Sequence, residues 1–195
     1  MGGRMQPEES WISPGALEAL VHQCAQKLFA VCREDPRTWL SEADLQAIFY
    51  AILWQDFPAH GLPVWALHVG YPCRLPSAEM ERLGRRGRAV PVNLGIVFPQ
   101  SVRLLSRRRW QARLRAALEI KRGYERYREI KDDLAKLAAI QRTWPEVQVW
   151  MIIMGYRSPH EDASAIRHLA QSMGVPLLGD NYWGKDRRIE QRELL

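Results

Sequence analysis

The 195-residue sequence has few cysteines, few histidines and no long apolar run, and each shortage excludes a class of protein. The three cysteines (Cys24, Cys32 and Cys73) are odd in number and form no CxxC spacing, which predicts reduced thiols and no zinc site. The five histidines form no HExxH or HxH set, and no glycine-rich phosphate loop leads from a strand into a helix. The apolar run at 151–154 (MIIM) has only strand length, so no membrane-spanning helix is expected. The opening residues lack the apolar core of a signal peptide, which predicts a cytoplasmic protein.

The sequence does have an excess of basic residues, and arginine dominates it. There are 28 Lys and Arg against 22 Asp and Glu, a net charge of +6, and 23 of the 28 are arginine. Residues 74–128 contain 15 basic and 4 acidic side chains, a balance of +11, whereas the other 140 residues have a balance of −5. Codon bias would spread arginines evenly along the chain. The asymmetry therefore favours a phosphate-binding surface, because arginine presents a planar fork that matches phosphate oxygens.

The apolar periodicity predicts one α/β domain spanning residues 1–195, with flexible tails at 1–12 and 185–195. Pro14 at a first helical position and the SEAD start at Ser41 mark two helices before the chain changes to a strand-like period. The expected elements are helices at 14–32, 41–54, 124–142 and 163–173 and strands at 64–71, 89–98, 115–121, 147–154 and 175–178. A helix that joins two strands implies a parallel crossover, so we expect a three-layer sandwich around a central mixed sheet.

Glu119 and Lys121 form the sharpest local signal. Alternation along a strand places both side chains on one face, with their Cα atoms about 7 Å apart. A carboxylate that holds Mg²⁺, beside a lysine that orients the attacking water, suits metal-assisted phosphodiester hydrolysis. The triplet alone also fits a solvated ion pair on a strand surface.

The surroundings of this pair resemble the PD-(D/E)xK nuclease superfamily, which has the restriction-endonuclease-like fold. Three motifs carry the resemblance, namely SEADLQ, GRAVPVNLGIVF and AALEIKRGYERYREIKDDLAKL. Their order matches the α-β-β-β-α-β core of the superfamily over residues 41–154. The resemblance implies Mg²⁺- or Mn²⁺-dependent cleavage of DNA, in bacterial or phage DNA transactions such as defence or mobile-element handling.

The resemblance also implies roles for four residues. Glu119 matches the metal-binding acid of the third strand, Lys121 the catalytic lysine, and Glu42 a helix acid that completes the metal shell in many relatives. Asn93 stands where the family has a metal-bridging aspartate, and an amide brings no negative charge to a hard cation. Three interpretations stay open: a degenerate nuclease fold, an engineered Asp→Asn change, or an active site in which an acid such as Glu42 substitutes. If the site is active, Glu119, Asn93 and Glu42 are the expected Mg²⁺ or Mn²⁺ ligands.

The arginines of the basic segment are expected to bind the phosphates of DNA, with RNA not excluded. The candidates are Arg85, Arg86, Arg88, Arg107, Arg108, Arg109, Arg113 and Arg122, and both arginine-rich segments are expected to lead into the site. Asp132 and Asp133 are interpreted as surface charges. The first hypothesis is a DNA-binding nuclease fold with an incomplete metal centre. The alternatives are an active Mg²⁺-dependent endonuclease and a non-catalytic protein–protein adaptor, with protein partners or a homodimer left open and no membrane partner.

Overall fold

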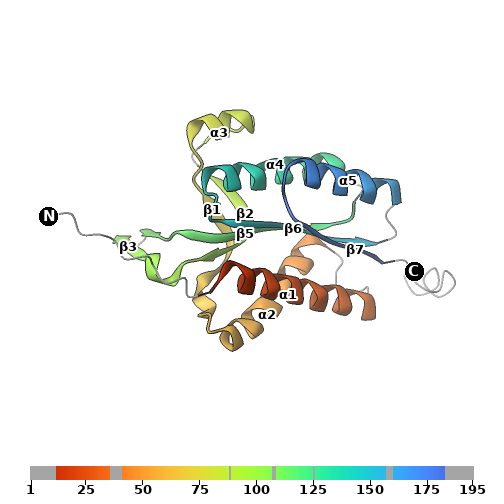
Figure 1. Cartoon of the computed structure of the whole chain (residues 1–195), viewed down its shortest axis with the longest axis horizontal. Coiled ribbons are helices and arrows are strands. Elements are labelled where there is room, and N and C mark those ends of the chain that lie inside the picture. The colour runs from red at the N-terminus through yellow and green to blue at the C-terminus, as the bar shows by residue number, and fades with distance from the viewer. Residues whose placement is uncertain are drawn as a thin grey trace.

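A five-stranded mixed sheet lies between two layers of helices, as expected from the sequence (Figure 1). The computed structural model describes residues 12–35, 41–87, 89–106, 109–124, 126–156 and 160–182. Its helices are α1 (Pro14–Glu34), α2 (Glu42–Asp56), α3 (Ser77–Arg82), α4 (Tyr127–Thr143) and α5 (His160–Ser172). Its strands are β1 (Leu67–Cys73), β2 (Val90–Val97), β3 (Arg103–Ser106), β4 (Arg109–Gln111), β5 (Leu114–Arg122), β6 (Gln148–Tyr156) and β7 (Leu177–Tyr182).

The sheet has the strand order β1-β2-β5-β6-β7. The pairs β1–β2 and β2–β5 are antiparallel, whereas β5–β6 and β6–β7 are parallel. Each parallel pair is joined by a crossover helix, α4 between β5 and β6 and α5 between β6 and β7. The prediction of a parallel crossover after the Glu119 strand is therefore confirmed.

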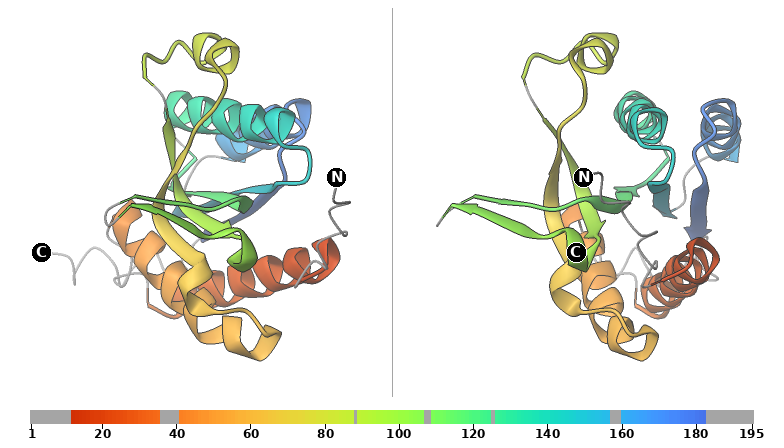
Figure 2. Two further views of the ribbon diagram at one scale, coloured as in Figure 1. Left: turned by 90° about the vertical axis from the view of Figure 1, so that its left-hand side faces the viewer. Right: turned by 60° about the vertical axis from the view of Figure 1, so that its left-hand side comes forward.

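Each face of the sheet is covered by one helix pair with its own apolar core (Figure 2). The α1 and α2 side contains Leu20, Phe49 and Trp150, all buried. The α4 and α5 side contains Leu134 and Ile166, also buried. The strands between them are apolar on both faces because both faces are covered, which explains the nearly continuous apolar sequence of β6.

Local signals fix the starts of the first two helices. The Ser13 side chain accepts a hydrogen bond from the Ala16 N–H, and Pro14 occupies the first helical position. At α2, Ser41 and Asp44 form a reciprocal capping box, which satisfies two backbone N–H groups. This cap holds Glu42 in the first turn of α2.

The β1–β2 ribbon leaves the plane of the sheet near Asn93. β2 pairs with β1 between Val90 and Ile96, but its ladder with β5 includes only residues from Leu94 onward. Side chains two residues apart share one face of a regular strand. Val92, however, packs in the core under α4 and Leu94 in the core under α2, so the faces of the strand are exchanged between these residues. Gly70 lies opposite this bend with φ +63°, a conformation that favours glycine. The result is a split between the first half of β2 and the second half of β5.

Several expected elements differ from the observed ones. Residues 64–66 form a 3-10 turn, so the first strand begins at Leu67 and not at 64. The helix expected at 124–142 begins at Tyr127, and the last strand covers Leu177–Tyr182 in place of 175–178. The short helix α3 and the β3–β4 hairpin were not expected at all. Most of the expected tails lie outside the described residues, but Ile12 packs in the α2-side core. Among the described helices none is long and apolar enough to cross a membrane.

Candidate functional site

Glu119 and Lys121 both point from β5 toward α4, which confirms the alternation expected from the sequence. The intervening Ile120 packs on the opposite face, in the α2-side core. Both charged side chains are buried: 1% of the Glu119 side chain and 10% of the Lys121 side chain are exposed. They are therefore not a solvated surface pair, and burial at this level requires partners for both charges.

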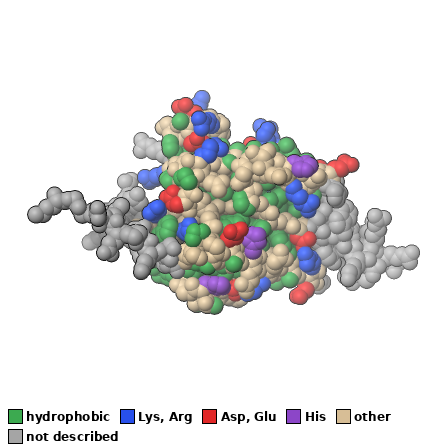
Figure 3. All heavy atoms as spheres, in the orientation of Figure 1, with side chains coloured by type: hydrophobic (Ala, Val, Ile, Leu, Met, Phe, Trp, Pro, Cys, Tyr) green, Lys and Arg blue, Asp and Glu red, His purple; other side chains and the backbone are tan. Residues whose placement is uncertain are grey.

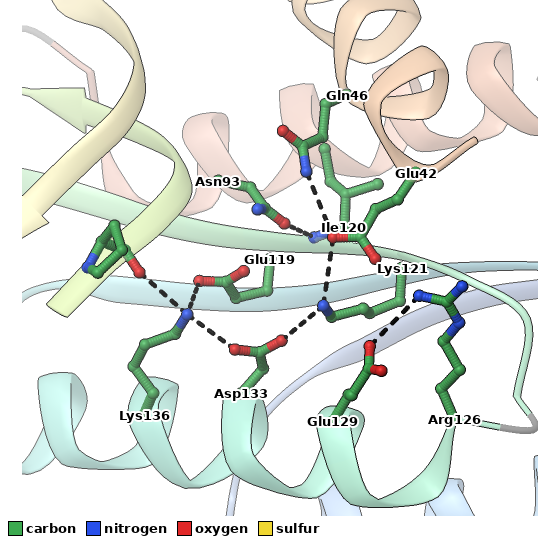
Figure 4. Close-up of polar contacts among 11 residues, drawn as sticks. Glu42, Gln46, Asn93, Glu119, Ile120, Lys121, Arg126, Glu129, Asp133 and Lys136 are labelled. Carbon is green, nitrogen blue, oxygen red and sulfur yellow. Dashed lines mark hydrogen bonds and ion pairs between the residues drawn. The ribbon is translucent and has the colours of Figure 1, made fainter. Parts of the chain in front are cut away.

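Two residues of α4, Asp133 and Lys136, supply these partners (Figure 4). The Lys136 ammonium lies 2.5 Å from Glu119 Oε1 and 2.8 Å from Asp133 Oδ1. The Lys121 ammonium lies 2.9 Å from Asp133 Oδ2. Asp133 was interpreted as a surface charge, and this is wrong, because its carboxylate is buried between the two lysines. Asp132 is exposed, as expected.

Glu42 extends the chain of ion pairs from the opposite helical layer. Its Oε1 lies 3.2 Å from the Lys121 ammonium and also accepts a weaker bond from Gln46 Nε2 at 3.4 Å. Figure 4 shows Glu42 and Asp133 on opposite sides of β5, with Lys121 between them. The contact between Glu42 and Lys121 crosses the sheet at the place where β2 and β5 no longer pair. Lys121 thus connects the α2 layer to the α4 layer, and the full sequence is Glu42–Lys121–Asp133–Lys136–Glu119, which we call the charge network.

Asn93 lies at the split but is engaged with the backbone. Its Oδ1 accepts a hydrogen bond of 2.6 Å from the Ile120 N–H. β5 has no ladder partner in β2 at this position, so the amide oxygen replaces the missing backbone acceptor. The polar residue in an apolar strand is therefore explained by the backbone geometry of the bend.

Burial and charge act against each other within the network. Burial raises the pKa of Glu119 to about 7, although the Lys136 ammonium opposes the change. Burial would also raise the pKa of Asp133, but Lys136 and Lys121 outweigh it and hold this pKa below the ordinary value. Burial would lower the pKa of Lys121, but Asp133 and Glu42 raise it instead. At neutral pH the network is thus held by charged Asp133 and Lys121, while Glu119 is close to its titration point.

The metal ion that the resemblance implies does not fit the donors as they are placed. The Glu42 and Glu119 carboxylates face lysine ammonium groups, and Asn93 Oδ1 faces a backbone N–H. Within the part of the chain that the structure describes, no three His, Cys, Asp or Glu side chains form a group that could hold a metal ion.

The expected phosphate-binding arginines are distributed over three separate places. Arg85 and Arg86 are exposed in the loop that follows α3, and Arg122 is half-buried at the end of β5. Arg113 pairs with Glu146 at 3.0 Å and lies over the Phe98 ring. Arg88, Arg107 and Arg108 lie outside the described residues, and Arg109 belongs to β4 without a described side chain.

The second arginine-rich segment enters β5 at the end of the strand opposite to Lys121. The β3–β4 hairpin directly precedes Leu114, where β5 begins, whereas Lys121 lies near the other end of that strand. At about 3.3 Å per residue these two positions are roughly 23 Å apart. Arg115, in the same basic run, is buried and donates to the Glu146 carbonyl at 2.8 Å, which is a structural role.

The α3 projection is anchored to α4 through one acid. Glu79 accepts from Arg82 at 2.6 Å and from Arg142 of α4 at 2.7 Å. Arg85 and Arg86 remain exposed on the projection, where Figure 3 shows Lys and Arg side chains together with a few acids. This loop therefore places two exposed arginines next to each other on the projection.

The residues that sequence reasoning missed are Asp133 and Lys136. A signal for Asp133 was present, because it follows Ile130 by three residues and precedes Leu137 by four, which places it on the buried stripe of α4. A charged residue on such a stripe indicates a buried partner.

Comparisons with models of known protein families, with curated proteins and with solved structures find no match to this chain. The resemblance of the three motifs therefore remains a hypothesis.

Proposed function

We propose that the chain is a DNA-binding protein with a restriction-endonuclease-like, PD-(D/E)xK core whose metal-dependent cleavage centre is incomplete. It binds the phosphate backbone through the arginine-rich α3 loop. The observation that carries the proposal is the charge network: the motif residues meet at one place, yet lysines and a backbone N–H engage their oxygen atoms.

The topology supports the restriction-endonuclease-like part of the proposal. α2, β1, β2, β5, α4 and β6 follow one another in the order α-β-β-β-α-β, apart from the short inserted elements α3 and β3–β4. The first three strands are antiparallel, and β6 is parallel to β5 after the α4 crossover. Glu42 of α2, the first helix of this core, contacts Lys121 of β5 through the split in the sheet.

The charge distribution supports the DNA-binding part. Residues 74–128 have a balance of +11, and their described part exposes Arg85 and Arg86 on a loop that projects from the body of the fold (Figure 1). Phosphate contacts from such a loop position a duplex without reading its sequence. The predicted interaction is therefore general for DNA and depends strongly on salt.

Fluorescence anisotropy with a labelled duplex of about 20 bp, between about 25 and 200 mM NaCl, tests this proposal. We expect binding at low salt with a steep loss of affinity as salt rises. The double variant R85A/R86A should weaken binding several-fold and reduce the slope of log K against log[NaCl] by about 2, because two phosphate contacts are lost. The control Lys131→Ala removes a charge from an exposed position on α4 outside residues 74–128 and should change affinity less than about twofold.

A cleavage assay separates the alternatives. Plasmid DNA incubated with the protein and Mg²⁺ or Mn²⁺ should stay intact. Cleavage that Lys121→Ala abolishes would establish an active endonuclease in place of the incomplete one. Absence of binding at the lowest salt to duplex DNA, single-stranded DNA and RNA would instead favour the protein–protein adaptor.

A further inference from the structure

Lys136 lies in a site made of oxygen atoms from three different elements. Its ammonium nitrogen is 2.5 Å from Glu119 Oε1 of β5, 2.8 Å from Asp133 Oδ1 of α4 and 3.0 Å from the Pro91 carbonyl of β2. Only 10% of the Lys136 side chain and 1% of the Glu119 side chain are exposed. Three oxygen atoms thus surround the ammonium within 3.0 Å, the carbonyl through a hydrogen bond and the two carboxylates as ion pairs.

This donor set is the kind that hard cations prefer. Two carboxylates and a backbone carbonyl are typical oxygen ligands of Mg²⁺, Mn²⁺ and Ca²⁺. We propose that Lys136 is a built-in cation: its ammonium occupies an oxygen-lined site that would otherwise take a divalent metal ion, and it makes the fold independent of metal.

The charges around the site agree with this role. Glu119 and Asp133 bring two potential negative charges to one ammonium, and Lys121 neutralises the second oxygen of Asp133 from the other side. Lys121 does not have the same surroundings, because the described residues pair it with the carboxylates of Asp133 and of the partly exposed Glu42. The three-oxygen site therefore belongs to Lys136.

The position also explains why three elements need a cation here. The first half of β2 has left the β5 ladder, and Lys136 is bonded both to Pro91 in that half and to Glu119 in β5. One ammonium thus links the diverging strands to each other and to α4. A metal ion bound by the same oxygen atoms would make the same link.

The experiment removes the ammonium with Lys136→Ala and measures thermal stability and Mn²⁺ binding with and without MnCl₂. The wild-type protein should show the same Tm in EDTA as in about 10 mM MnCl₂, and calorimetry should find no saturable Mn²⁺ binding. Lys136→Ala leaves the two carboxylates and the carbonyl with an open space between them. Its Tm should fall by roughly 10 °C, and MnCl₂ should recover about 5 °C or more, with about one ion bound per chain.

Two controls make the result specific. Lys131→Ala removes an exposed lysine from the same helix and should change neither Tm nor Mn²⁺ binding. D133N/K136A removes one carboxylate of the site as well, and MnCl₂ should no longer rescue it.

Three outcomes would overturn the proposal: stoichiometric Mn²⁺ binding by the wild type, no saturable binding by folded Lys136→Ala, or equal rescue of D133N/K136A. If Lys136→Ala is unfolded without metal, circular dichroism during an MnCl₂ titration decides, since regained helicity supports the proposal and none refutes it. The inference concerns cation affinity and stability alone, so its failure is distinguishable from a failure of DNA binding.

Discussion

Replacing Glu119 by glutamine should remove a specific dependence of stability on pH. The folded pKa of Glu119 is about 7 because the carboxyl group is buried, whereas an unfolded glutamate ionises near 4.5. Between these two values the folded protein holds a proton that the unfolded chain has lost. The stability that protonated Glu119 contributes to the wild type therefore falls as the pH rises from about 4.5 to about 7, and it is lost above that. Glutamine keeps an oxygen for Lys136 but cannot ionise.

The size of the effect follows from the difference in proton affinity. A pKa raised from 4.5 to about 7 corresponds to about 3 kcal/mol at 25 °C. Asp133 and Lys121 do not contribute in this window, because the pKa of Asp133 is lowered and that of Lys121 is raised, away from it. Burial lowers the pKa of His68, which gives the opposite slope, but His68 is present in both proteins.

Urea denaturation of the wild type and of Glu119→Gln at several pH values from about 4.5 to 8.5 measures the effect. The quantity of interest is the difference in the free energy of unfolding between the two proteins, in which the other titrating groups cancel. This difference should change by about 3 kcal/mol, because the free energy of unfolding of Glu119→Gln increases relative to that of the wild type as the pH rises. For an m-value of about 2 kcal/mol/M the midpoints should move apart by roughly 1.5 M urea.

Two results would refute the reasoning. Parallel stability curves would mean that Glu119 titrates at its ordinary pKa, and hence that water or the Lys136 ammonium offsets the effect of burial. A wild type that gains on Glu119→Gln as the pH rises would mean that Lys136 outweighs burial and lowers the pKa.

Two further predictions concern the bend and the packing of β2. Asn93→Ala should destabilise the protein by about 1–3 kcal/mol in urea denaturation, because the buried Ile120 N–H loses its acceptor, while Asn93→Asp keeps an acceptor there and should lose less. Gly95→Ala should lower Tm by several degrees, because a Cβ at this position would lie 2.5 Å from Tyr71 Cβ. Gly15→Ala, where a Cβ meets nothing within 4 Å and the residue is helical, should leave Tm equal or slightly higher in differential scanning calorimetry.

The parts of the fold that sequence reasoning predicted depend on short-range signals. Pro14 and Ser41 mark the helix starts because capping involves residues only a few positions apart. The shared face of Glu119 and Lys121 follows from strand alternation alone. The crossover between β5 and β6 follows from the order of elements.

The parts that were missed depend on length or on distant partners. α3 has six residues and the strands of the β3–β4 hairpin have four and three, too short for a periodic pattern to develop. The burial of Asp133 and Lys136 depends on Lys121 and Glu119, which lie on another element. The bend at Asn93 has no local signal beyond the polar residue itself, because it is defined by where β2 stops pairing with β5.

The ion pairs between α4 and β5 also fix how the crossover helix can dock during folding. Glu119 and Lys121 are about 6.6 Å apart along the strand, and Asp133 and Lys136 are separated by about 4.5 Å along the helix axis. Signs alternate in both pairs, and the two elements run in opposite directions, so Lys136 meets Glu119 and Asp133 meets Lys121. A helix displaced by one turn would bring Asp133 to Glu119 or Lys136 to Lys121, a like-charge contact in a water-poor layer. Partly folded states in which α4 is displaced along β5 are therefore disfavoured. Apolar packing alone would allow several positions of the helix, and the ion pairs select one of them.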